Sequence, residues 1–209
     1  MNTSELAKQK LRIAILSGST NNDPEEMSRS RALAEKYRDH LVSKGADVDW
    51  VDFRDLPDLP DWDDKFYDSY RDRINNADGL VISTPIYNYG PSGKVLQFLH
   101  GTLDSEDQQY KPYSLLSGAG SPRSALALSG LATSLNHEIK GIGIGGGVQV
   151  SGTDMNRRTG VIKRKIVDRA RQNADKLLQV ANALRTKESG YRKAYLQGAA
   201  LAKATFKNV

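Results

Sequence analysis

Short apolar segments alternate with helix-like segments along most of the chain, and this alternation restricts the fold more than any other feature of the sequence. The apolar segments, which predict strands, cover residues 11–16, 47–51, 79–84, 112–116 and a glycine-interrupted stretch within 139–150. Helical spacing of apolar residues marks the segments that follow them, at 28–43, 63–76, around 95–99, 124–135 and 154–185. Strands that alternate with helices predict βαβ units and a parallel sheet with helices on both faces.

Five such repeats fit one α/β domain with a flavodoxin-like, doubly wound sheet of five parallel strands. The 209 residues are enough for one full-sized core and short for two, so we expect this domain to cover residues 1–186. Residues 187–209 form a C-terminal tail, predicted to be helical, whose apolar residues have no place in a five-strand unit. A helix that packs on a neighbouring subunit and a frayed end both fit this tail.

Cysteine is absent, which excludes disulfides, thiolate zinc sites, iron–sulfur clusters and cysteine nucleophiles. Any redox chemistry therefore needs a bound cofactor. The first ten residues are polar, unlike a signal peptide, and no apolar run approaches the roughly 20 residues that span a bilayer. We expect a soluble, cytoplasmic protein with no membrane span. The net charge is +5, but no nucleic-acid-binding motif accompanies it, so we expect no nucleic-acid partner.

Three chemically unusual loops follow the first, third and fourth predicted strands, and in a doubly wound sheet these loops meet at the carboxyl edge where ligands bind. The first loop is SGST, residues 17–20, and SRS follows at 28–30 where a helix begins. Hydroxyls and unpaired backbone N–H groups at a helix start suit an anion such as a terminal phosphate. For Ser28 alone, a simple helix-capping role competes with this interpretation.

The second loop, STPIYNYGPSG at residues 83–93, suits a flat aromatic ligand. Tyr87 and Tyr89 offer stacking faces, and bent backbone offers polar groups to the edge of a ring. The alternative is that both rings only pack the loop down. The third loop, SGAGS at 117–121, is small enough for its backbone to approach the same ligand. Together the loops predict a cradle for a planar ligand with a phosphate at one end.

Other patterns in the sequence indicate structure rather than chemistry. The glycine-rich run at 141–147 precedes a strand-like segment, so it favours a glycine-rich strand or bulge over a dinucleotide fingerprint. Residues 90–94, GPSGK, are too short between their glycines for a phosphate-binding P-loop. The histidines and the acidic cluster around residues 61–64 lack the spacing of metal ligands, so we expect no metal site.

With these motifs the chain resembles the NADPH-dependent FMN reductase family of flavodoxin-like flavoproteins, which includes quinone, azo and chromate reductases. The resemblance covers roughly the first three quarters of the chain. Its motifs are Gly18-Ser19 with a later Ser28-x-Ser30, Pro85-x-Tyr87-Asn88 followed by Gly93-x-Val95, and Lys111-Pro112 leading to Ser117-x-x-Gly120. The family usually has an arginine soon after the first Gly-Ser pair, whereas this chain inserts residues 21–27 there.

The resemblance implies that FMN is the cofactor. Its phosphate would be held by Ser17, Ser19, Thr20, Ser28, Arg29 and Ser30. Its ring would lie along Pro85, Ile86, Tyr87, Asn88, Tyr89 and Gly90, with Ser117, Gly118, Ala119 and Gly120 on the far side. Because the flavin carries the chemistry, we predict no catalytic side chain. Arg123 is predicted to attract the phosphates of the nicotinamide co-substrate.

The implied activity is transfer of hydride from NADPH or NADH through bound FMN to a small acceptor, which is a quinone, free flavin, an azo compound or a metal oxyanion. The family also implies a homodimer or homotetramer. One alternative is a flavodoxin-like electron carrier or binding module that holds FMN without turning over NAD(P)H. The basic charge disfavours a carrier, since electron-carrier flavodoxins are typically acidic. A second alternative is a relative that no longer holds flavin.

Overall fold

A parallel sheet lies between two layers of helices. The computed structural model describes residues 10–103, 108, 110–121 and 126–185. The strands run in the order β2-β1-β3-β5-β6, and β7 pairs with β5 further along the same side as β6. Their bounds are β1 (Arg12–Ser17), β2 (Asp47–Asp52), β3 (Gly79–Tyr87), β5 (Pro112–Gly118), β6 (Ile142–Gly143) and β7 (Val148–Val150). This confirms the predicted flavodoxin-like order, with β6 and β7 sharing the fifth position.

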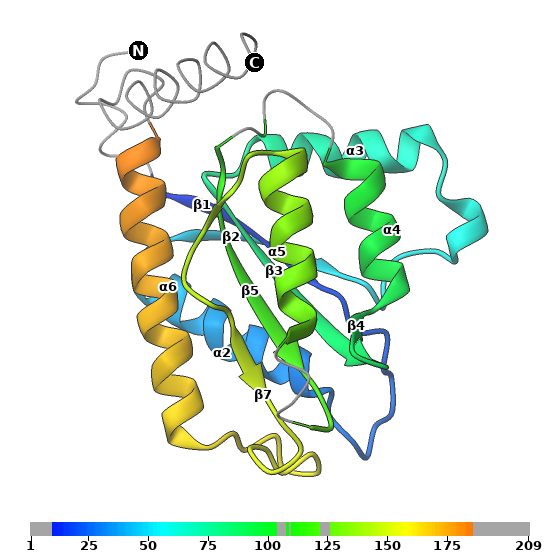
Figure 1. Ribbon diagram of the computed structural model, residues 1–209, viewed down its shortest axis with the longest axis vertical. Helices are drawn as coiled ribbons and strands as arrows, with labels where there is room; N and C mark the ends of the chain where they lie inside the picture. Colours follow the sequence, from blue (N-terminus) through cyan, green and yellow to red (C-terminus); the bar gives the residue numbers. More distant parts are fainter. Residues whose placement is uncertain (1–9, 104–107, 109, 122–125, 186–209) are drawn as a thin grey trace, which may run out of the picture.

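Helices cover both faces of the sheet. Their bounds are α2 (Arg29–Ser43), α3 (Asp64–Asn75), α4 (Gly93–Thr102), α5 (Ala127–Glu138) and α6 (Arg164–Leu184), with a short 3₁₀ turn η1 (Leu59–Asp61) before α3. Figure 1 shows α4 and α5 in front of the sheet and α2 behind it. One apolar cluster joins the sheet to α3, α4 and α5, and a second joins it to α2 and α6.

Strand β1 shows why the apolar segments become central strands. Ile13 and Ile15 belong to the cluster under α2 and α6, whereas Ala14 and Leu16 belong to the cluster under α4 and α5. All four side chains are completely buried. Successive side chains of a strand point to opposite faces, so an unbroken apolar run suits a strand that is covered on both sides. This arrangement brings the carboxyl ends of β1, β3 and β5 to one edge of the sheet.

The third strand is longer than the predicted 79–84. It continues to Tyr87 and folds back as a hairpin onto a short strand, β4 (Gly90–Pro91), which pairs with it antiparallel. The two connecting residues, Asn88 and Tyr89, have positive φ angles of 47° and 63°. Positive φ at both central residues is the mark of a type I′ turn, whose twist matches that of the strands it joins. The second predicted loop is therefore largely a β-hairpin.

The helix predicted for 154–185 is wrong at its beginning, because α6 starts only at Arg164. The segment before it is a loop closed by an isolated bridge between Met155 and Ile162. Gly160 within this loop has a φ of 69°, a backbone region that glycine adopts readily and that does not continue a helix. The loop therefore turns back on itself before the helix begins.

The structure confirms that the glycine-rich run at residues 141–147 belongs to strands and the turn between them, and that it is not a dinucleotide-binding fingerprint. After β6 the chain turns through Gly145 and Gly147, both at positive φ, and then enters β7 rather than a helix. The helix predicted for 124–135 is α5, whose described part runs from Ala127 to Glu138; residues 124 and 125 and the tail at 187–209 lie outside the described residues. Within the described ranges, no helix is long and apolar enough to cross a membrane.

Candidate functional site

A cavity of about 440 Å³ opens at the edge of the sheet where β1, β3 and β5 end. The predicted site residues that line it are Ser19, Thr20, Ser28, Arg29, Ser30, Pro85, Ile86, Tyr87, Gly118, Ala119 and Gly120. Asn21 and Arg157 also line it, and neither was predicted. Ser17, Asn88, Tyr89, Gly90 and Ser117 are not among the lining residues. All three predicted loops thus contribute to one cavity.

The end of β1 lies directly against α4, and glycine allows this approach. A Cβ built on Gly18 would come 2.1 Å from the Cγ2 atom of Val95 and 2.9 Å from the carbonyl oxygen of Ser83. The N–H of Gly18 donates to that same Ser83 oxygen at 2.8 Å. Close packing therefore fixes the direction in which the following residues leave the strand, and Ser19, next along the chain, is only 1% exposed.

The beginning of α2 forms one wall of the cavity. Ser28 is the N-cap, and its hydroxyl accepts from the N–H of Arg31 at 3.4 Å and lies 3.1 Å from the hydroxyl of Ser30. The capping interpretation of Ser28 is therefore confirmed, and the same residue also lines the cavity. The hydroxyl of Ser83 donates to the carbonyl of Ser30 at 2.8 Å, which ties the helix start to β3.

Gly118 brings the end of β5 against this helix start. A Cβ at this position would lie 2.3 Å from the backbone nitrogen of Ser30 and 2.7 Å from the Cβ of Arg29. No side chain can be accommodated there without moving backbone. A Cβ on Gly120, two residues later, would have no atom within 4 Å. The third loop therefore has one glycine that packing requires and one that faces open space.

Several buried polar atoms lie near the cavity without a partner. Within the part of the chain that the structure describes, the hydroxyls of Ser17 and Ser117 and the Nε of Arg29 are buried and make no hydrogen bond. Burial lowers the pKa of Arg29, the charge of Arg157 lowers it further, and Glu26 opposes them. Buried polar groups are usually paired in a folded protein, so this concentration of unpaired donors points to a polar ligand.

Arg157 comes from the loop before α6 and was missed by the sequence analysis. Its guanidinium forms an ion pair with Glu26, and its Nε donates to the carbonyl of Met27 at 3.2 Å. The N–H of Met27 donates to the carbonyl of Arg157 at 3.0 Å. These contacts join two loops that are 130 residues apart in the chain. No local pattern indicates a pairing over this distance in the chain, and the sequence predicts a helix over residues 157–163 instead.

Asp52, at the end of β2, anchors α2 through Arg31, the third residue of the helix. Arg31 and Arg54 both form ion pairs with this carboxylate, the latter at 2.9 Å, and Arg31 also pairs with Glu35 at 3.0 Å. Burial of Asp52 favours its neutral form, but the hydrogen bonds from Arg54 and Arg31 outweigh burial and lower the pKa to about 2. The carboxylate is therefore ionised at neutral pH and holds the helix in place.

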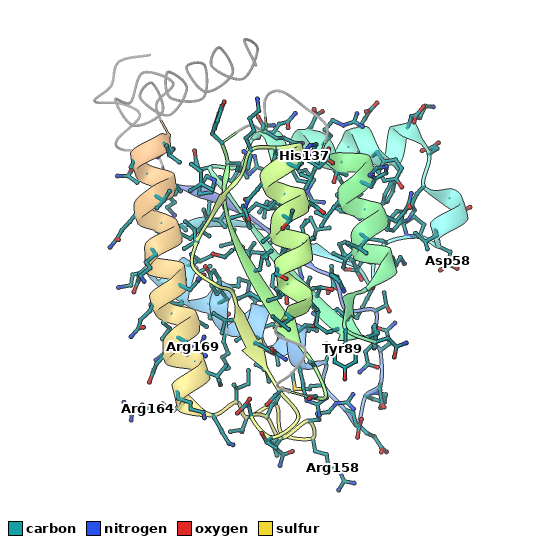
Figure 2. All side chains as sticks on the ribbon, in the orientation of Figure 1. Asp58, Tyr89, His137, Arg158, Arg164 and Arg169 are labelled. Carbon is teal, nitrogen blue, oxygen red and sulfur yellow. The ribbon has the colours of Figure 1, made fainter. Side chains whose placement is uncertain are left out.

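The hairpin also lines the cavity, and its tip is exposed. The residues Tyr87 and Tyr89 are 63% and 71% exposed, so the alternative that these rings pack the loop down is wrong. Figure 2 shows Tyr89 at the end of the hairpin, well away from Arg158 at the lower end of the molecule. The N–H of Ser92 donates to Thr84 Oγ1 and to the carbonyl of Pro85, both at 3.1 Å, which closes the hairpin at its base.

The remaining predicted residues are placed as follows. The backbone of the third loop is tied to β7, because the N–H of Ala119 donates to the carbonyl of Val150 at 3.0 Å. Arg123, predicted to contact a nicotinamide co-substrate, lies outside the described residues. Figure 2 shows His137 at the upper end of α5, and this residue is not among those that line the cavity. Among the described residues, no three histidine or acidic side chains gather as a metal ion would require.

Comparisons with known proteins match this architecture. A family model described as NADPH-dependent FMN reductase matches residues 11–153. An apo NADH:FMN oxidoreductase has a TM-score of 0.66 and 20% identity, over 81% of this chain and 90% of that one. RosB with bound 8-demethyl-8-formylriboflavin-5′-phosphate has a TM-score of 0.64 and 16% identity, over 92% and 87%. An NAD(P)H:quinone oxidoreductase from Methanothermobacter marburgensis has a TM-score of 0.54 and 16% identity, over 81% and 98%. No curated protein matched the sequence.

Proposed function

The chain belongs to the NADPH-dependent FMN reductase family, and from that premise we propose that it is an FMN-containing enzyme that passes reducing equivalents from NADPH or NADH to a small acceptor. Family membership makes it a flavin-dependent oxidoreductase. The observation that carries the finer proposal is that all three loops predicted to bind FMN line one cavity at the carboxyl edge of the sheet.

The polar end of this cavity fits the phosphate of FMN. Three serines, 19, 28 and 30, line it beside the start of α2, and Arg29 adds a cation whose Nε has no partner in the described part of the chain. Hydroxyl donors, a guanidinium and a helix N-terminus are the groups that proteins use to bind phosphate. The unpaired hydroxyls of Ser17 and Ser117 offer further hydrogen bonds to the cofactor or to ordered water.

The hairpin end fits the ring. Pro85, Ile86 and Tyr87 line the cavity together with Gly118, Ala119 and Gly120, so a flat group would contact both the β-hairpin and the small-residue loop. When bound, FMN supplies the ability to accept and release a hydride. The chain supplies orientation: the hairpin and third loop hold the ring, and the exposed tyrosines leave a hydrophobic surface where a nicotinamide and then an acceptor can stack.

The charged groups that line the cavity support a binding role rather than acid–base chemistry. They are Arg29 and Arg157, and no carboxylate or histidine is among the described lining residues. Arginine stays protonated under physiological conditions, so it can bind an anion but cannot exchange a proton with a substrate. We therefore assign these two side chains to cofactor binding and name no residue as a catalytic acid or base.

The test is a spectrum. FMN is added to the purified protein, the excess is removed on a desalting column, and NADPH or NADH is then added without oxygen. Retained flavin absorbance that bleaches supports the reductase, and steady-state assays with a quinone, free flavin, an azo dye and chromate then identify the acceptor. Absorbance that is retained and bleaches only with dithionite supports an FMN-binding electron carrier. A protein that retains no flavin is a relative that no longer holds flavin, and in that case the proposal fails.

Two further parts of this proposal concern the extent of the domain and the oligomeric state. We propose that residues 1–186 act as one FMN-binding domain and that the protein is a homodimer or homotetramer, as the family implies. Light scattering coupled to size-exclusion chromatography checks the mass, and a chain ending at residue 186 checks the domain boundary. A monomer at all concentrations contradicts the homo-oligomer, and loss of FMN binding on truncation contradicts the domain boundary.

A further inference from the structure

Two loops meet at the polar end of the cavity, and Arg157 joins them. The loop at residues 20–28 contains the segment inserted after the first Gly-Ser pair, and the loop at 151–163 precedes α6. Arg157 contacts the first loop through an ion pair, a side-chain hydrogen bond and a backbone hydrogen bond. A Cβ on Gly160 would lie 2.5 Å from the Sδ of Met27, so the loops also pack closely. They form one structural unit.

The charges in this unit are unbalanced. Arg29 and Arg157 both line the cavity, and they are close enough for the charge of Arg157 to lower the pKa of Arg29. Glu26 is the carboxylate paired with Arg157, and for Arg29 no ion pair exists among the described residues. Two cations and one carboxylate leave a net positive charge at the cavity wall. A phosphate monoester, which carries nearly two negative charges at neutral pH, would more than offset it.

Donors also remain available on both arginines. A guanidinium has five N–H donors. Arg157 uses its Nε and Nη1 in the contacts above, and no partner for its Nη2 exists in the described part of the chain. The Nε of Arg29 is buried without a hydrogen bond there. Like charges held side by side with unused donors are an unfavourable arrangement unless an anion completes it.

We propose that Arg157 and Arg29 form a two-arginine clamp for a terminal phosphate, and that this clamp makes the protein select FMN over riboflavin. Arg157 then takes the place of the arginine that the family usually has soon after the first Gly-Ser pair, because the inserted segment is bonded to the distant loop that carries Arg157. The inference rests on the proposed function, since it assumes that a flavin occupies the cavity. It adds the specificity: the terminal phosphate, and not the ring alone, decides which flavin binds.

The competing explanation is that Arg157 only ties the two loops together. The two explanations differ in their dependence on the ligand. A structural tie supports the whole cavity, so its loss weakens FMN and riboflavin equally. A phosphate clamp contributes only when the phosphate is present, so its loss weakens FMN and leaves riboflavin unchanged.

The experiment measures the dissociation constants of FMN and riboflavin by quenching of flavin fluorescence with the apo protein. The variants are Arg157→Met, Arg29→Met and Arg157→Lys, with Arg158→Met as the matched control. Arg158 is the next residue in the same loop, and Figure 2 shows its side chain pointing away from the molecule. Circular dichroism and thermal unfolding establish that each variant is folded. Riboflavin affinity serves as an internal check that the ring end of the cavity is intact.

The clamp predicts that FMN binds about tenfold or more weakly in each methionine variant, as expected for loss of a charge-assisted hydrogen bond to phosphate, while riboflavin binding stays within about twofold. Arg157→Lys keeps the charge but loses the forked geometry, so it falls between the wild type and Arg157→Met. Arg158→Met matches the wild type. The dependence of FMN affinity on salt is shallower in the methionine variants.

Three results overturn the clamp. If Arg157→Met weakens the affinity for FMN and riboflavin equally, Arg157 only stabilises the two loops. Unchanged binding of both flavins shows that the residue does not reach the ligand. Equal affinity of the wild type for FMN and riboflavin removes the specificity while leaving the proposed flavin chemistry intact. A wild type that binds neither flavin is a different result, because it overturns the proposed function itself.

Discussion

The two ends of the cavity are built in opposite ways. The arginine end, made of residues 17–30 and 151–163, is held by ion pairs, by backbone hydrogen bonds between distant loops and by glycines that packing requires. The hairpin end, residues 83–92, has a closed base but a tip whose two tyrosines are more than 60% exposed. A cofactor that stays needs a rigid site, and substrates that come and go need an open one. The contrast therefore separates affinity from exchange within one cavity.

The largest expected effect is on the start of α2, which belongs to the arginine end: Gly118→Val, at the end of the neighbouring strand β5, should abolish FMN retention. The new side chain collides with the backbone of the α2 start, so the helix must shift and we expect a loss of about 3 kcal/mol in the free energy of unfolding. Urea unfolding and flavin retention measure the two effects. Gly120→Ala is the control, since its Cβ meets open space and should change stability by less than about 0.5 kcal/mol. Equal losses in the two variants would contradict the packing argument.

The second prediction concerns pH and Asp52. Its pKa in the folded protein is about 2, below the value of about 3.9 in an unfolded chain. A lowered folded pKa contributes stability that is complete above the unfolded pKa and is lost as the pH falls through the folded one, so about 2 kcal/mol should disappear between about pH 5 and pH 2. Asp52→Asn should be less stable than the wild type at pH 7 and should lack this part of the acid dependence. Parallel wild-type and variant curves from urea unfolding across this range would show that the ion pairs contribute nothing.

At the hairpin end, Tyr89→Gly should separate stability from turnover. A tyrosine at a φ of 63° is strained by about 1 kcal/mol relative to glycine, and Asn-Gly is the preferred pair for a type I′ turn. We expect the variant to be about 1 kcal/mol more stable, with FMN affinity unchanged. We also expect several-fold lower kcat/KM with a bulky quinone, because an exposed ring that tolerates strain is a candidate for substrate contact. Tyr87→Phe, which keeps the ring, is the control. If Tyr89→Gly is more stable and keeps full activity with the quinone, the strained backbone at Tyr89 has no role in turnover.

The smallest effect is predicted at Glu26. Glu26→Gln removes the carboxylate that pairs with Arg157, while the Nε bond from Arg157 to Met27 remains. Less negative charge beside the phosphate should raise FMN affinity by about twofold to threefold at low salt and leave riboflavin unchanged. Titration at two salt concentrations measures it. Weaker FMN binding would indicate instead that Glu26 positions Arg157.

The sequence predicted the fold because the central strands are continuous apolar runs with buried partners on both faces. The order of the strands in a flavodoxin-like sheet brings the three loops to one edge. Ser19, Ile86 and Gly120 can therefore be assigned to one site from the topology, without any measured distance. The hairpin was only partly predicted. Its turn depends on positive φ at Asn88 and Tyr89, and tyrosine is not a residue that signals such a turn.

Arg157 could not be predicted, and the reason is physical. Its position depends on Met27 and Glu26, which lie 130 and 131 residues earlier, and long-range pairing leaves no periodic trace in a sequence. The basic stretch around it continues into a helical pattern from Ile166 onward, so the sequence predicts a helix that begins earlier than α6 does. A single glycine, Gly160, was the local sign that the helix begins later.

The pairing of Met27 with Arg157 also sets the order in which the molecule can be completed. Protein synthesis proceeds from the N-terminus, so β1, the serines and the hairpin all emerge before the loop that carries Arg157. The last wall of the cavity is therefore added when more than two thirds of the chain has been made. A ribosome-bound chain that stops before β7 contains every predicted cofactor-binding residue and still lacks the finished cavity.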